Sequence, residues 1–80
     1  MNVDEKDFKF LKEFIIRDLG WFLMDEFGMS LEKALDAVYE SKTYEALCNP
    51  NSEFYFQSSE YVYQFLKKEI TTGRFEMSFL

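Results

Sequence analysis

The sequence has 80 residues, with 15 acidic and nine basic side chains, no histidine and a net charge of −6. A chain of this length forms one domain, which we expect to span residues 1–80. Apolar residues make up 48% and aromatic residues 20%, which excludes a disordered chain. The missing histidine excludes the Ser-His-Asp and Cys-His catalysts. The acidic balance argues against direct binding of nucleic acid.

The single cysteine, Cys48, cannot form an internal disulfide, and we expect it to behave as a half-buried small hydrophobe. Without histidine, a second cysteine or a calcium-loop motif, the sequence predicts no metal site and no cofactor. Its acidic start does not resemble a signal peptide. The longest apolar run, Trp21–Met24, is far shorter than the ~20 residues that span a bilayer. We therefore expect a cytoplasmic protein without membrane contact.

Few glycines, prolines and β-branched residues predict a compact all-α fold of three or four helices. The longest helix is expected from about residue 4 to residue 27, with acidic side chains in its first turn, where the helix dipole favours them. We expect Lys9, Glu13, Arg17 and Gly20 to lie opposite one apolar arc. That arc is predicted to hold Phe8, Phe10, Leu11, Phe14, Ile15, Leu19, Trp21 and Phe22.

Helix boundaries are marked by small and polar residues. Gly28 suits the left-handed position that ends a helix, and Ser30 suits the N-cap of a second helix over residues 31–41. A short third helix is expected over 43–47, followed by a turn at 49–52. Ser58 or Ser59 is expected to cap a last helix over 59–72 that ends at Gly73.

Two short segments alternate between apolar and polar residues, at about 53–57 and 75–79. Alternation is typical of extended backbone. A minimal two-stranded β pairing at the edge of the domain is one outcome. The other is an extended tail lying on the core, which we favour because isolated strand pairs are marginally stable.

Two carboxylates, Asp18 and Asp25, are expected on the apolar side of the first helix. Because an unpaired buried carboxylate is costly, each should be paired or partly hydrated. We expect a buried ion pair with Lys67, Lys68 or Arg74 of the last helix, or a position at the rim of the core. Acid–base chemistry between the two carboxylates is the alternative.

The sixteen aromatic side chains exceed what so small a domain readily buries. We expect the excess to form contacts with a partner, and a homodimer is the first hypothesis. Trp21, Tyr55, Tyr63 and Phe79 are the candidate contact residues, since tyrosine and tryptophan suit interfaces. The acidic charge favours a basic partner, although it also serves solubility.

The stretch from Phe27 to Leu35, FGMSLEKAL, resembles small helical bacterial proteins of unknown function. So do the stretches YFQS at 55–58 and YVY at 61–63, followed by Leu66 and Lys67. The similarity covers roughly residues 10–72. Some of those proteins are encoded beside ADP-ribosyltransferase-like toxins, so the resemblance implies a helical fold and an accessory or antitoxin-like role. It implies no binding residue.

Taken together, these patterns predict a non-enzymatic protein-interaction module. The alternative is a small-molecule or peptide binder with an apolar pocket between the first and last helices, lined by Phe, Met and Tyr side chains.

Overall fold

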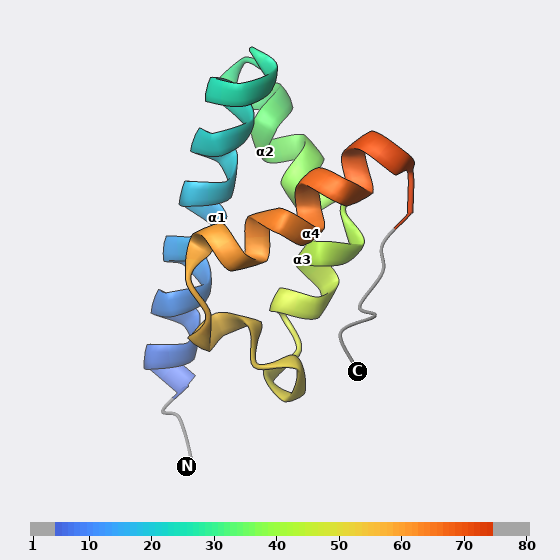
Figure 1. The fold of residues 1–80 in the computed structure, drawn as a ribbon. Coiled ribbons are helices and arrows are strands. Elements are labelled where there is room, and N and C mark those ends of the chain that lie inside the picture. Colours follow the sequence, from blue (N-terminus) through green and yellow to red (C-terminus); the bar gives the residue numbers. More distant parts are fainter. Residues whose placement is uncertain (1–4, 75–80) are drawn as a thin grey trace.

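The computed structural model describes residues 5–74, and within that range it contains helices and no strand (Figure 1). Four of them are α-helices: α1 (Glu5–Phe27), α2 (Leu31–Tyr39), α3 (Lys42–Leu47) and α4 (Ser59–Thr72). Two short 3-10 turns, η1 (Pro50–Ser52) and η2 (Phe54–Phe56), connect α3 to α4. The predicted all-α fold is confirmed.

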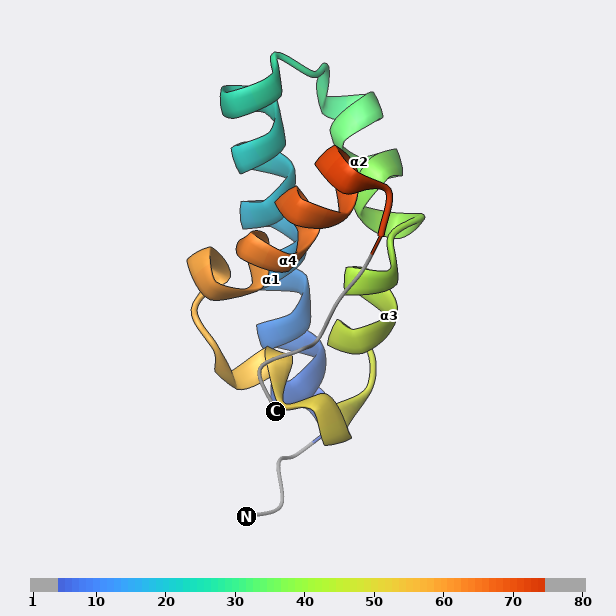
Figure 2. The same ribbon diagram turned by 45° about the vertical axis from the view of Figure 1, so that its right-hand side comes forward.

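The helix α1 is the longest element, and its 23 residues extend for about 35 Å. The turn after α1 reverses the chain, so that α2 returns beside it, and α4 crosses the domain against α1 and α3 (Figures 1 and 2). Every other α-helix therefore packs directly or through one neighbour onto α1.

The core consists of aliphatic side chains and two aromatic rings. Its members come from all four helices and from η2: Ile15, Ile16, Leu19, Leu23, Ala34, Val38, Leu47, Phe54, Tyr55, Val62 and Leu66. At Gly20, a Cβ atom would lie 3.2 Å from Cδ2 of Leu35, so the missing side chain lets α2 approach α1 closely. Gly20 was expected on the solvent side of α1, and that expectation is wrong.

The predicted apolar arc of α1 is also wrong for Phe10 and Trp21, which are 67% and 66% exposed. At 100° per residue, both side chains lie about 160–180° from Leu19, on the side of the helix away from the core. Apolar residues therefore occur on both sides of α1, and only one of these sides is covered.

The predicted helix boundaries are confirmed at four positions. Gly28 and Gly73 adopt left-handed backbone conformations, with φ of 67° and 75°. The Ser30 and Ser58 hydroxyls accept the backbone N–H groups of the third residues of α2 and α4, at 3.2 and 3.1 Å. Glycine reaches positive φ without strain, and a serine cap satisfies an N–H that has no partner within the helix.

The short helix α3 depends on a residue that is distant in sequence. The Glu69 carboxylate of α4 accepts the backbone N–H groups of Lys42 and Thr43, at 2.7 and 3.0 Å, and the Thr43 hydroxyl at 2.9 Å. Ser41 caps the same helix by accepting the N–H of Tyr44 at 3.0 Å. These bonds supply partners for N–H groups that six residues of helix cannot satisfy alone.

The segment predicted as extended over 53–57 is instead the 3-10 turn η2, so this prediction is wrong. Its backbone N–H groups bond locally, from Phe56 to the Glu53 carbonyl at 3.1 Å and from Gln57 to the Phe54 carbonyl at 3.0 Å. Successive residues of a 3-10 helix point about 120° apart, so Phe54 and Tyr55 both reach the core. The second segment of the β pairing, 75–79, lies outside the described residues.

Candidate interaction surface

The side of α1 away from the core carries a row that we call the outer stripe, formed by Phe10, Phe14, Arg17 and Trp21. These residues are spaced four, three and four positions apart, so the row extends for about 16 Å along one side of the helix. Phe14 is 45% exposed, and the flanking Phe10 and Trp21 more so. The Arg17 guanidinium lies 5.3 Å from the centre of the Phe14 ring. Three rings and one cation thus face solvent in a line.

A shallow hollow of about 360 Å³ lies within the outer stripe. Its lining residues are Phe10, Glu13, Phe14 and Arg17. They occupy positions i, i+3, i+4 and i+7 of a single helix, so a side chain entering the hollow would meet two rings, one anion and one cation.

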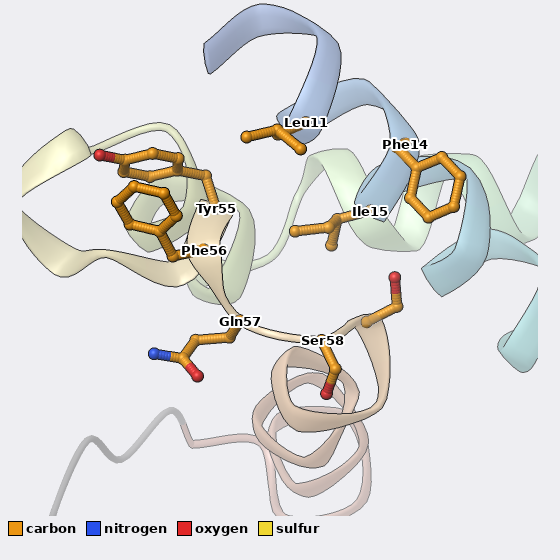
Figure 3. Close-up of a pocket in the computed structure, with 8 residues that line it drawn as sticks. Leu11, Phe14, Ile15, Tyr55, Phe56, Gln57 and Ser58 are labelled. Atoms are coloured by element: carbon orange, nitrogen blue, oxygen red, sulfur yellow. The ribbon is translucent and has the colours of Figure 1, made fainter. Parts of the chain in front are cut away.

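A second concavity adjoins the stripe, between α1 and the segment that links η2 to α4 (Figure 3). This groove has a volume of about 220 Å³ and is lined by Leu11, Phe14, Ile15, Tyr55, Phe56, Gln57, Ser58 and Ser59. Phe56 is 50% exposed and stacks on Tyr55, with ring centres 4.5 Å apart. Phe14 lines both concavities, so the stripe and the groove form one continuous surface.

A buried polar contact fixes one wall of the groove to α1. The Ser59 hydroxyl donates to Oδ2 of Asp18 at 2.6 Å. Ser59 is the first residue of α4, so the half-buried Asp18 carboxylate also lies near the positive end of that helix dipole. The bond thereby positions the start of α4, and with it the residues of the groove wall, against α1.

For Asp18 and Lys67, the contacts differ from the predicted buried ion pair. Asp18 bonds to Ser59, and the Lys67 ammonium lies 3.0 Å from Glu26 in an exposed pair. Asp25 and Lys68 are exposed. Half-buried Asp18 and exposed Asp25 match the alternative of a rim position. They also do not form the buried carboxylate pair that acid–base chemistry would need.

At the far end of α1, Glu26 accepts the Tyr63 hydroxyl at 2.6 Å and the Lys67 ammonium at 3.0 Å. These two donors lower the pKa of Glu26. Burial, followed by the hydrogen bond to Glu26, raises the pKa of Tyr63. The Tyr63 ring also packs on Phe22, with ring centres 5.0 Å apart. Tyr63 is therefore engaged within the domain at both its ring and its hydroxyl.

Of the four predicted contact residues, Trp21 lies on the surface as expected, in the outer stripe. Tyr55 is only 8% exposed, so its expected place on the surface is wrong. Its ring packs edge-on against Phe8, with ring centres 5.0 Å apart. Tyr63 is half-buried, and Phe79 lies outside the described residues.

Sequence reasoning missed Phe10, Phe14 and Phe56 as surface residues. A signal for the first two was present, because at 100° per residue Phe10 and Trp21 lie about 20° apart and Phe14 lies between Trp21 and the groove. Phe56 gave no such signal, since its direction depends on the local 3-10 geometry of η2.

Two further groups are relevant to chemistry. Cys48 is half-buried, as expected, and a hydrogen bond to it, together with burial, raises the pKa of Tyr44.

Across residues 5–74, no three His, Cys, Asp or Glu side chains are grouped so that they would hold a metal ion. None of the helices described there combines the length and apolarity needed to cross a bilayer.

No protein-family model, curated protein or solved structure matches the chain. The candidate surface is therefore interpreted from its own geometry and chemistry.

Proposed function

We propose that this chain is a non-enzymatic protein-interaction module that binds an α-helix of a protein partner along α1. The observation that carries the proposal is the outer stripe, in which Phe10, Phe14 and Trp21 are 67%, 45% and 66% exposed in one row. Single exposed apolar residues are ordinary, whereas a continuous apolar patch is typical of a binding surface.

The energetics favour contact with a partner. Aromatic side chains provide large contact areas and lose little conformational freedom, because they have only two χ angles. At about 25 cal/mol per Å², covering the exposed parts of three such rings gains several kcal/mol. The Arg17 guanidinium lies 5.3 Å from the centre of the Phe14 ring, so the surface combines apolar contact area with a positive charge.

The shape of the surface favours a helix over a small molecule. The hollow within the stripe, at about 360 Å³, is near the lower limit of the ~300–1,000 Å³ typical of ligand pockets, and the groove, at about 220 Å³, is below it. It also differs from the predicted pocket between the first and last helices, since its lining contains Phe and Tyr but no Met. The stripe, by contrast, repeats at the four- and three-residue spacing that packs against another helix.

Site-specific photo-crosslinking in the native host tests the proposal. A photoreactive phenylalanine analogue would replace Phe14 or Trp21 of the stripe. The matched control places it at Tyr39, an aromatic residue of α2 that is 51% exposed. We expect covalent protein products from the two stripe positions and none, or different ones, from position 39. Equal products at all three positions, or no product from the stripe, would contradict the proposal.

The accessory or antitoxin-like role suggested by the resemblance stays a prediction. Identification of a toxin-like protein among the crosslinked products would support that role directly.

A further inference from the structure

We infer that the partner helix is α1 of a second copy of this chain, packed antiparallel, so that the two outer stripes face each other. The inference rests on the proposed function and names its partner. The stripe residues follow the alternating four- and three-residue spacing of a coiled-coil seam. In a symmetric pair of identical helices, both helices use the same set of contacting residues.

The residues around the hollow in the stripe have the spacing of a hole in a coiled coil. A side chain of one helix packs into a hole formed by four residues of the facing helix. Phe10, Glu13, Phe14 and Arg17 occupy positions i, i+3, i+4 and i+7, and they surround a hollow of about 360 Å³. A knob from the second copy therefore has a preformed place to enter.

The position of Arg17 selects the antiparallel arrangement. Two parallel copies would place Arg17 beside Arg17 of the second copy, and these like charges repel. In an antiparallel pair centred between residues 15 and 16, Phe10 faces Trp21 of the second copy and Phe14 faces its Arg17. Ring then meets ring and ring meets cation, which are both favourable contacts. Phe14 already accommodates a guanidinium at 5.3 Å within its own chain.

Charge complementarity supports the same register. Glu13 lies one helical turn before Arg17, on the same flank of the stripe. In the antiparallel pair, Glu13 of each copy lies close to Arg17 of the other. Two symmetry-related ion pairs therefore flank the rings. Although each chain carries a net charge of −6, the stripe together with Glu13 is neutral, so this surface does not add to the repulsion between copies.

The area matches a weak, reversible dimer. A buried aromatic side chain covers about 150–250 Å². With exposures of 67%, 45% and 66%, the three rings of each copy leave part of this area open, and the two copies together offer ~500–900 Å² for burial. The flanking Glu13, Arg17 and Phe56 side chains bring the total toward ~1,200 Å², the lower limit of stable interfaces. We therefore expect a dissociation constant in the micromolar range.

Sedimentation equilibrium of the purified full chain, from low to high micromolar concentration, tests this dimer. Trp21 is the chain's only tryptophan, so its fluorescence reports on the stripe directly. We expect dimer formation to coincide with a shift of emission to shorter wavelength and with protection from iodide quenching. Trp21→Ala should abolish the dimer. Leu31→Ala, at a 58% exposed apolar position on α2, should leave the dimer unchanged.

A charge swap tests the register. Glu13→Arg and Arg17→Glu should each weaken the dimer about tenfold or more, because each puts like charges together across the interface. The double variant Glu13→Arg, Arg17→Glu should recover the part of the affinity that comes from the ion pairs, but not the contact between Phe14 and the guanidinium of Arg17. Circular dichroism of each variant checks that the helices are retained.

A wild-type chain that stays monomeric at high micromolar concentration would overturn the inference, as would a double variant that recovers nothing. The crosslinking products then decide the proposed function separately. A monomer that still crosslinks to another protein through positions 14 and 21 retains the interaction module without self-association. A monomer without such products loses both.

Discussion

On α1, the fully buried apolar side chains differ in size from the exposed ones. Inward, Ile15, Leu19 and Leu23 are at most 3% exposed and belong to the core. Outward, the larger Phe10 and Trp21 are two-thirds exposed. Hydrophobicity alone therefore does not determine which side of this helix faces the core. A domain of this size has a small interior, and aliphatic side chains together with Phe54 and Tyr55 fill the space between α1 and the elements packed on it.

The difference between the two sides also separates two kinds of free energy. Burial of the inward side stabilises the fold of a single chain. The exposed rings of the outward side contribute little to that fold, but they gain free energy when they meet a partner. Substitutions on α1 should therefore divide into those that change unfolding and those that change association.

The largest expected effect comes from a pair of truncations on opposite sides of α1. Leu19→Ala should lower the free energy of unfolding by about 2–5 kcal/mol, because it leaves a cavity in the core. Trp21→Ala should change it by less than about 0.5 kcal/mol at a concentration where the chain is monomeric. Urea unfolding followed by circular dichroism measures both. Similar losses from the two substitutions would contradict the expected difference between the two sides of α1.

The next effect concerns the close packing of α1 and α2. Gly20→Val should lower the free energy of unfolding by about 1–3 kcal/mol, because the new side chain would meet Leu35. Arg17→Val on the outward side is the control for β-branching within a helix, and it should cost only about half a kcal/mol. Thermal and urea unfolding of both variants check this difference. Because valine is a better helix former than glycine, helix propensity favours Gly20→Val, so a loss no larger than that of Arg17→Val would contradict the close α1–α2 contact.

A smaller effect is expected at the boundary between the two sides, where Asp18 binds Ser59. Asp18→Asn retains an oxygen acceptor but loses the charge, and it should lower the free energy of unfolding by about 1 kcal/mol. A double-mutant cycle with Ser59→Ala measures the coupling. If Ser59→Ala costs the same with and without the Asp18 carboxylate, the negative charge of Asp18 adds nothing to this hydrogen bond.

The smallest effect depends on pH and concerns Glu26. Its pKa is lowered in the folded chain because the Tyr63 hydroxyl and the Lys67 ammonium donate to it. A carboxyl of this kind stabilises the fold above its unfolded pKa, and that contribution is lost as the pH falls through the folded value. Melting temperatures of Glu26→Gln should thus fall less steeply on acidification than those of the wild type.

Asp25→Asn, an exposed carboxylate beside Glu26, controls for the removal of one negative charge. Parallel acid profiles for the wild type and Glu26→Gln would contradict the expected linkage.

The sequence predicted the helix ends well because their signals are local. Gly28, Ser30, Ser58 and Gly73 act within one turn of backbone, and the structure confirms each of them. The sides of the helices depend on which neighbours cover them. Periodicity shows where apolar residues lie on α1, but it does not show how wide a sector α2 and α4 cover. That is why Phe10 and Trp21 were wrongly included in the predicted arc.

The turn at η2 and the polar contacts depend on pairs of distant residues. A run of three aromatic residues, Phe54 to Phe56, fits a strand or a turn equally well in one dimension. The partners of Asp18 and Lys67 lie about 41 positions away in both cases. Candidate charges can be found from composition and spacing, whereas partners separated by this distance are determined by the packing of α4 on α1.

The hydrogen bonds from the start of α3 to Glu69 affect the order in which the chain folds during synthesis. Six residues of helix are too few to persist by themselves in water. The Glu69 carboxylate accepts hydrogen bonds from the N–H groups of Lys42 and Thr43, and Glu69 is synthesised 26 residues after Thr43. A nascent chain that has released α1 and α2 can already form a helical hairpin, while the stretch from Lys42 to Leu47 must wait for α4. The middle of this protein is therefore completed last.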